Sequence, residues 1–272
     1  MAENTKKKGF IGNILALPND NPKKTIFVAV LLCLVCSVLV STSAVVLKPL
    51  QQVNKANDIK KNILAVTGLL TDDADIDALF DQFETKVVNL DTGAYEDIDV
   101  TTYDQRKAAS DPAQSVTLTA EQDIASIGSR AKLATVYLLK DGDAVKQVVL
   151  PVHGYGLWST LYGFISFDAD FNTIGGLQFY EHAETPGLGG EVDNPKWRKQ
   201  WQGKKAFNDQ GELKIEVIRG FVDYKVAGAE HKVDGLSGAT LTSVGVSNLV
   251  KYWLGENAFG PYLKNMRSEM GK

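Results

Sequence analysis

The sequence predicts an α+β protein: a single N-terminal transmembrane helix followed by one exported domain, which has a mostly antiparallel sheet and flanking helices. Two observations carry this prediction. Residues 25–47 form an uncharged, largely apolar run, and from residue 133 the chain reads as strands joined by hairpins. They divide the 272 residues into a cytoplasmic N-terminus (1–24), a transmembrane helix (25–47), a helical stalk with an amphipathic helix (48–92) and an exported domain (93–272).

The uncharged run is long enough to cross a membrane. As a helix, residues 25–47 extend about 35 Å, against a bilayer core of about 30 Å. The small residues at 41–44 would suit a cleaved signal peptide, but the apolar stretch exceeds the roughly 7 to 15 residues of a signal core. Lys23 and Lys24 abut the run and favour a cytoplasmic N-terminus. We therefore expect a single-pass protein of a bacterial inner membrane, with residues 49–272 in the periplasm.

Composition excludes several classes of partner and site. Six of the 29 basic and two of the 33 acidic residues precede residue 49, which leaves the exported part with a formal charge of −8. Nucleic acid is therefore an unsuitable partner. The two cysteines, Cys33 and Cys36, both lie in the apolar run, where free cysteine behaves as a small apolar residue. The three histidines show no ligand spacing, so we expect no metal site.

Periodicity assigns the remaining elements. A helix is expected over residues 50–70, ending near Gly68, and a second, amphipathic helix follows, with apolar residues every third or fourth position from Ile76 to Val87. Strands are expected at 133–140, 146–152, 162–167 and 174–181, and alternation from Leu213 to Val217 indicates a half-buried strand. Residues 194–202 read as a short basic helix whose tryptophans, Trp197 and Trp201, face the core.

The most informative segment is Asp234-Gly-Leu-Ser-Gly-Ala-Thr240, which precedes a helix with apolar residues from Val246 to Leu254. Gly238 and Ala239 leave no bulk beside the Thr240 hydroxyl. We expect Thr242 or Ser243 to cap the helix, so a phosphate on Thr240 would lie where free N–H groups favour negative charge. The simplest alternative is a turn into a capped helix.

A hydrolase is a second alternative, because Gly235-Leu-Ser-Gly-Ala239 matches the nucleophile-elbow motif G-x-S-x-G except at its last position. That fold needs a histidine after the serine, and all three histidines precede Ser237. We therefore discount it and expect no catalytic residue in this chain.

Two loops upstream have the composition of a site that binds a flat ring. In the segment Glu184-Thr-Pro-Gly-Leu-Gly-Gly190, glycines open the backbone to close approach, although an irregular turn would have the same composition. The glycine-spaced loop at 154–158 ends in Leu157 and Trp158, and this tryptophan could pack against a ring or in the core.

The segments His182–Gly189 and Asp234–Thr240, in this order, resemble the two signatures of the FMN-binding domain family. The resemblance implies that Thr240 carries FMN through a phosphoester bond and that a separate flavin transferase attaches it. Together with the two loops, it gives these candidate cofactor-binding residues: Thr240, Asp234, Ser237, Gly238, Ala239, Thr242, Leu157, Trp158, Glu184, Thr185, Gly187 and Leu188.

The anchor, the stalk and the two signatures together resemble the flavin-carrying subunits of the Na⁺-translocating NADH:quinone oxidoreductase family. This resemblance implies a subunit that is not catalytic alone. It would relay electrons between an iron–sulfur centre and a second flavin, with the other membrane subunits of the complex as partners. The related ferredoxin-linked electron-transport complexes have a similar subunit, which stays an alternative. So does a membrane-anchored assembly or docking subunit without a redox role.

Overall fold

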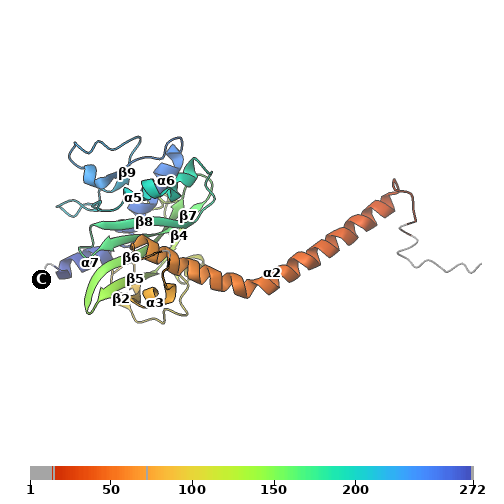
Figure 1. Cartoon of the computed structure of the whole chain (residues 1–272), viewed down its shortest axis with the longest axis horizontal. Helices are drawn as coiled ribbons and strands as arrows, with labels where there is room; N and C mark the ends of the chain where they lie inside the picture. The colour runs from red at the N-terminus through yellow and green to blue at the C-terminus, as the bar shows by residue number, and fades with distance from the viewer. Residues whose placement is uncertain (1–13, 15, 72, 271–272) are drawn as a thin grey trace, which may run out of the picture. The chain divides into compact units, whose positions relative to one another are not determined.

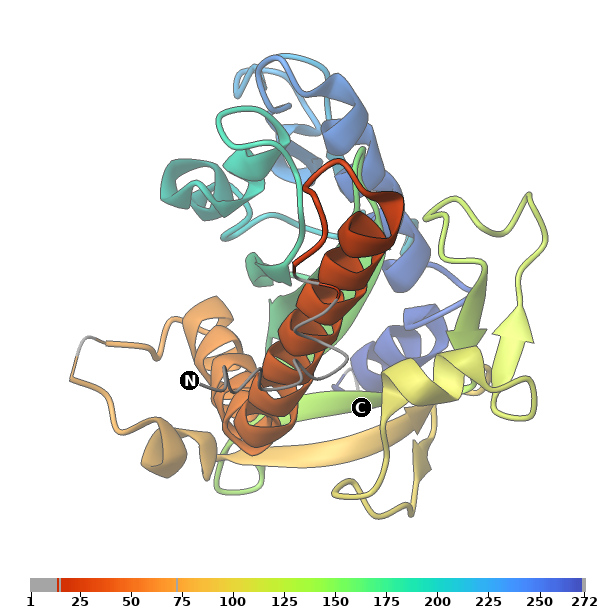
Figure 2. The ribbon, with the colours of Figure 1, turned by 90° about the vertical axis from the view of Figure 1, so that its right-hand side faces the viewer.

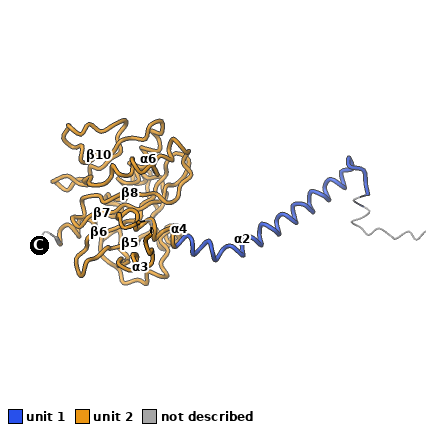
Figure 3. Tube along the Cα trace, in the orientation of Figure 1, with its two compact units in different colours: residues 1–56 blue, residues 57–272 orange. Residues whose placement is uncertain are grey.

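The computed structural model describes residue 14 and residues 16–71 and 73–270; most of the expected cytoplasmic N-terminus lies outside them. The chain divides into two compact units, residues 1–56 and residues 57–272 (Figure 3). Each unit is described by itself.

The long helix α2 (Pro22–Val66) runs from the first unit into the second (Figure 1). Among the described residues it is the one helix long and apolar enough to cross a membrane, and the side chains of its apolar stretch are exposed. Pro49 lies inside it and lacks the N–H that would bond the carbonyl one turn earlier. The expected helix over 50–70 is therefore not a separate element, because the span and the stalk form one helix.

The C-terminal end of α2 is buried in the second unit. Ile63 and Leu64 are fully buried, and the Ser166 hydroxyl donates a hydrogen bond of 2.8 Å to the Val66 carbonyl. A Cβ atom at Gly176 would lie 2.8 Å from the same carbonyl oxygen, so the close approach depends on glycine. Gly68, at φ +76°, follows the helix end near the expected position.

The prediction of an amphipathic helix from Ile76 to Val87 is correct only up to Phe80. Helix α3 (Ile76–Phe80) begins at Asp75, whose carboxylate accepts hydrogen bonds from two N–H groups of the first turn, and it ends at Phe80. Residues from Phe83 onward form strand β1 (Phe83–Asn89), which pairs with β5 through seven residue pairs. The ladder to a central strand thus overrides the local helical pattern, and part of the expected stalk at 48–92 belongs to the sheet.

The six-stranded sheet is antiparallel throughout, in the order β2-β1-β5-β6-β7-β8. Four of its strands lie where they were expected, and the α+β fold class is confirmed. Besides β1, its strands are β2 (Tyr95–Glu96), β5 (Leu133–Asp141), β6 (Ala144–Tyr155), β7 (Thr160–Asp168) and β8 (Ile174–Glu181).

Two small sheets and several short helices complete the second unit. The strand expected from Leu213 to Val217 is reduced to β9 (Glu216–Val217), which pairs with β10, and Leu213 forms only an isolated bridge with Phe207 among the described residues. The other elements are α4 (Gln105–Ser110), β3 (Ser115–Thr117), β4 (Ser129–Ala131), η1 (Gly189–Asp193), α5 (Pro195–Lys199), η2 (Ala229–His231), β10 (Lys232–Val233), α6 (Thr240–Leu254) and α7 (Gly260–Met270).

The two faces of the sheet carry separate cores. Along β6, Val148 and Leu150 belong to the larger cluster, which contains residues of α6 and α7, whereas Val149 belongs to the smaller cluster under the end of α2. Figure 2 shows the sheet with α6 rising from it. Trp197 and Trp201 are buried in the larger cluster, as expected. Helix α6 is therefore fixed along its length, and its N-terminal residue is held in a defined place.

Candidate functional site

Thr240 is the first residue of α6, and its side chain is exposed. Among the described residues, its hydroxyl has no hydrogen-bond partner. Gly238, two residues earlier, has φ +73°, a conformation that costs a residue with a β-carbon. The predicted features of the Thr240 loop, an open hydroxyl and a glycine turn before a helix, are therefore present in the structure.

The expected helix cap is wrong. Ala239 occupies the N-cap position and offers no side-chain hydrogen bond. Ser243 instead lies inside the first turn, where its hydroxyl accepts from the Leu236 N–H at 2.8 Å and donates to the Ala239 carbonyl at 3.1 Å. The first N–H groups of the helix thus receive no side-chain cap, and such groups attract anions.

Glu184 joins the three segments that the sequence singled out. Its buried carboxylate accepts hydrogen bonds through Oε1 from the N–H groups of Leu157 at 3.0 Å and Trp158 at 2.9 Å. The Ser159 N–H contributes a third at 3.3 Å. Through Oε2, the carboxylate accepts from the Thr242 hydroxyl at 2.7 Å. One side chain therefore holds the 156–159 loop against the first turn of α6.

These contacts favour an ionised Glu184. Burial on its own raises the pKa of the carboxyl, but the hydrogen bonds from the Trp158 N–H, the Thr242 hydroxyl and the Leu157 N–H outweigh burial and bring the pKa below its ordinary value. The carboxylate therefore stays charged at neutral pH. Three backbone N–H groups and one hydroxyl of the domain stabilise its negative charge, and among the described residues no basic side chain forms an ion pair with it.

Three glycines allow the segments to touch. A Cβ atom at Gly156 would lie 2.6 Å from Glu184 Oε1, and one at Gly189 would lie 2.5 Å from Oε2. At Gly245 on α6, a Cβ atom would lie 2.5 Å from the Tyr155 carbonyl oxygen. The backbones of the two loops and of α6 therefore approach more closely than residues with side chains would permit.

Apolar side chains are exposed around this junction. Trp158 is 66% exposed and Leu188 is 45% exposed, and a Cβ atom at Gly238 would touch Leu188 Cδ2 at 3.0 Å. Leu157 is also exposed. Sequence reasoning missed Leu241 and Val244, which are exposed on the first turns of α6. The sequence could have indicated them, because both are apolar residues outside the apolar stripe that starts at Val246. Packing of α6 against its own core does not require apolar side chains at these two positions.

The remaining candidates lie at the edges of the junction. Asp234 bonds to neighbours other than Thr240: its carboxylate accepts from the Val222 N–H at 2.7 Å, and its carbonyl accepts from the Trp197 indole N–H at 2.8 Å. The Thr185 carbonyl accepts from the Leu188 N–H at 3.1 Å and shapes the glycine loop. Gly187 has φ +75° with open space beside it, and Ser237 is exposed.

Comparison with known proteins places this junction in a family. The FMN-binding domain family matches residues 156–255, a range that starts at the first of the three glycines and includes Glu184 and Thr240. The C subunit of the Na⁺-translocating NADH-quinone reductase of Vibrio anguillarum is 49% identical over 254 residues, which cover 93% of this chain and 98% of the relative. This chain belongs to the family of these C subunits.

Further members of the family agree with this assignment. The C subunit of Pseudomonas aeruginosa is 49% identical over 253 residues, covering 91% of this chain and 97% of the relative. The crystal structure of NqrC from Shewanella oneidensis has a TM-score of 0.72 at 34% identity and covers 79% of this chain and 99% of that chain. The crystal structure of the C subunit from Parabacteroides distasonis has a TM-score of 0.61 at 29% identity, covering 80% and 96%. The predicted family resemblance is confirmed.

Proposed function

We propose that this chain is the flavin-carrying electron-transfer subunit of a Na⁺-translocating NADH–quinone reductase and holds FMN through a phosphoester bond to Thr240. The single observation that carries the proposal is the junction at Glu184, which holds the 156–159 loop and its own signature loop against the first turn of α6, two residues after Thr240. Membership in the C-subunit family and the FMN-binding domain match support it.

The residues present fit such a group. The Thr240 hydroxyl is exposed and unpartnered among the described residues, and Gly238 leaves room beside it. A phosphate on Thr240 would lie at the uncapped N-terminus of α6, where N–H groups and the helix dipole favour negative charge. We propose that Leu157, Trp158 and Leu188 flank the ring, with Leu241 and Val244 as further apolar contacts.

The protein's own part in the chemistry is small. The bound flavin supplies the electron-transfer chemistry, and the chain fixes its position and surroundings. During maturation, the Thr240 oxygen would attack the flavin-side phosphorus of FAD. The new Thr240 oxygen–phosphorus bond forms as the phosphoanhydride bond breaks, AMP leaves, and the hydroxyl proton passes to solvent. A flavin transferase would catalyse this step, and Thr240 would afterwards act only as a tether.

In the assembled complex, the chain would receive electrons from an iron–sulfur centre of the membrane subunits and pass them to a second flavin. The exposed apolar side chains around Thr240 favour close contact with such partners, because they would be buried on docking. Helix α2 would anchor the chain in a bacterial inner membrane. Lys23 and Lys24 at its start favour a cytoplasmic N-terminus, so residues 49–272 would lie in the periplasm.

An assembly subunit without a redox role is the competing function. In-gel fluorescence under ultraviolet light after denaturing electrophoresis separates the two, because only a covalent flavin stays with the denatured chain. We expect a fluorescent band in the wild-type protein expressed with its transferase and no fluorescent band for Thr240→Val. A wild-type band without fluorescence would favour the assembly role.

A further inference from the structure

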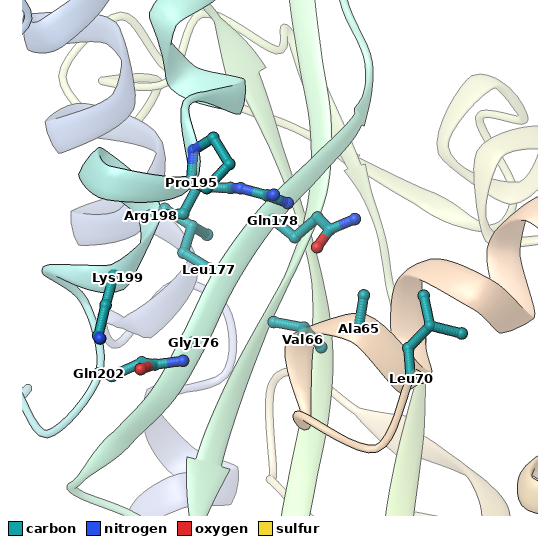
Figure 4. A pocket seen from close by; sticks show the side chains of 10 residues that line it. All are labelled: Ala65, Val66, Leu70, Gly176, Leu177, Gln178, Pro195, Arg198, Lys199 and Gln202. Carbon is teal, nitrogen blue, oxygen red and sulfur yellow. The ribbon is translucent and has the colours of Figure 1, made fainter. Parts of the chain in front are cut away.

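A groove of about 420 Å³ lies beside strand β8, and none of its lining residues belongs to the proposed flavin site. In Figure 4, Arg198 and Lys199 stand on one side of β8, and Val66, the last residue of α2, and Leu70, in the loop after it, stand on the other. Gln178 projects from the strand between them. The groove therefore follows a strand, with cations along one of its walls.

Strand β8 is an edge of the six-stranded sheet, and among the described strands it pairs with β7 alone. At its start the outer edge is satisfied, because Ile174 exchanges backbone hydrogen bonds with Lys204 and Gly203 at 2.8 Å each. Over residues 175–181, no backbone group bonds to any described residue outside β7. Alternate N–H and C=O groups of this stretch thus have no protein partner in the described chain.

The usual protections of an edge are largely missing in this stretch. Residues 175–181 contain no proline and no lysine, which native proteins use to blunt an exposed edge. The pairing with β7 is irregular at both ends of β8, yet it is regular from Gly176 to Phe179. A regular stretch of edge without proline or lysine, beside a groove, is the arrangement that accepts an additional strand from a partner.

The charge of the groove indicates the charge of its partner. The lining residues include Arg198 and Lys199 and no acidic residue. Neither cation forms an ion pair or a side-chain hydrogen bond within the described chain, and the same holds for Lys196 on the same short helix. In addition, Arg198 Nε is buried without a hydrogen-bond partner. In an exported part of formal charge −8, an unpaired cationic wall is complementary to an acidic segment.

We infer that this groove receives an extended, acidic segment of another subunit of the complex, which adds as a strand to the open edge of β8. Backbone hydrogen bonds to the edge would provide the affinity, and Arg198 and Lys199 would select the acidic side chains. The inference rests on the proposed membership in a complex but not on the flavin. A failure of flavin loading would therefore leave it standing.

Photo-crosslinking in the intact complex tests the contact. Gln202 lines the groove and is exposed, so we would replace it with the photoreactive residue p-benzoylphenylalanine. Illumination of membranes should give a covalent adduct with one other subunit, and mass spectrometry should place the link in an acidic segment. The same residue introduced at Lys225, which is exposed outside the groove, is the matched control.

Charge reversal tests the role of the cations. Arg198→Glu with Lys199→Glu should reduce the adduct at least tenfold, whereas Lys225→Glu with Lys264→Glu, at two exposed and unpaired lysines, should leave it unchanged. Unchanged hydrogen exchange of the central strand β5 in both double variants serves as the check on folding. The inference is overturned by an adduct no stronger than at the control position, by an adduct only with lipid or with a second copy of this chain, or by one that survives charge reversal.

Hydrogen exchange of the intact complex tests strand addition itself. In the wild-type complex, the amides of residues 175–181 should all be protected, since an added strand satisfies the groups that β7 does not. The groove double variant should exchange the outward-facing amides at least tenfold faster, while those of the central strand β5 stay unchanged. Equal exchange of residues 175–181 in both complexes would contradict the added strand.

Discussion

Thr242 donates its hydroxyl hydrogen bond to the buried carboxylate of Glu184 at 2.7 Å, across 58 positions of sequence. No other described group donates to Oε2 of that carboxylate. The contact holds the first turn of α6 to the loops that we propose as the walls of the flavin. This contact therefore stabilises the fold, and we expect that contribution to be independent of the flavin attachment at Thr240.

Replacing Thr242 should cost stability. In Thr242→Val the side chain keeps its shape but leaves Glu184 Oε2 buried without a donor, which destabilises by about 1–3 kcal/mol. Urea unfolding of the purified protein, followed by tryptophan fluorescence, measures the change. In protein expressed without a flavin transferase, Thr240→Val is the matched control, because the exposed hydroxyl of Thr240 has no partner among the described residues and its loss should change the free energy of unfolding by less than about 0.5 kcal/mol. Equal losses in the two variants would count against the junction.

The ionised state of Glu184 should appear in the pH dependence of stability. Because the folded pKa lies below the ordinary value of about 4.3, the carboxylate stabilises the fold fully above that value and loses its contribution as the pH falls through the folded pKa. Glu184→Gln should therefore unfold more easily at neutral pH, and its stability should fall less steeply below about pH 4.5. Glu121→Gln, at an exposed glutamate, should follow the wild-type curve. If the stability of Glu184→Gln and of the wild-type protein fell in parallel with pH, an ionised Glu184 in the folded state would be refuted.

Gly187 tests whether the glycine loop receives the ring. Gly187→Val adds a branched side chain at φ +75°, and it should reduce flavin loading or shift the flavin absorption. Gly211→Val has matched strain, since Gly211 has φ +78° and open space beside it, yet it lies in the turn between Asn208 and Glu212, which has none of the candidate residues, and it should load flavin normally. Absorbance ratios of the purified proteins report the loading. Full loading with an unchanged spectrum in both variants would make the 184–189 loop a structural turn only.

The anchor should be retained in the mature protein. The apolar stretch of α2 is longer than a signal core, and the helix continues without interruption into the folded domain. Cleavage near residue 45 would cut this helix. Intact mass or N-terminal sequencing of protein extracted from membranes should find residues that precede the span. A mature chain that starts near Val45 would show that the segment is a removed signal.

Sequence reasoning succeeded where local chemistry decides the structure. The strand expected at 174–181 matches β8 at both of its ends, and the small residues before Thr240 indicated the open loop at the start of α6. In these segments the local pattern and the tertiary environment agree. The link between Thr240 and a flavin phosphate rests on the family signatures, not on periodicity, and it stays a prediction.

Sequence reasoning failed where a partner far away in the sequence determines the local structure. Residues from Phe83 onward have helical spacing, but pairing with β5 makes them a strand. Thr242 has the side chain of a helix cap, yet its hydroxyl bonds to Glu184 in a loop far away in the sequence. Nothing local distinguishes Glu184 from a solvated glutamate, because its donors come from residues 157–159 and 242, which only the fold brings together.

Peptide mass spectrometry of the Thr240 segment decides whether this chain carries a covalent flavin. Trypsin should release residues 233–251 as one peptide, since no lysine or arginine lies between Lys232 and Lys251. For protein expressed with its flavin transferase and partner subunits, this peptide should be heavier by FMN less one water, with fragments that place the addition on Thr240. An unmodified peptide from that protein, or a modification that persists in Thr240→Val, would show that Thr240 is not the attachment site.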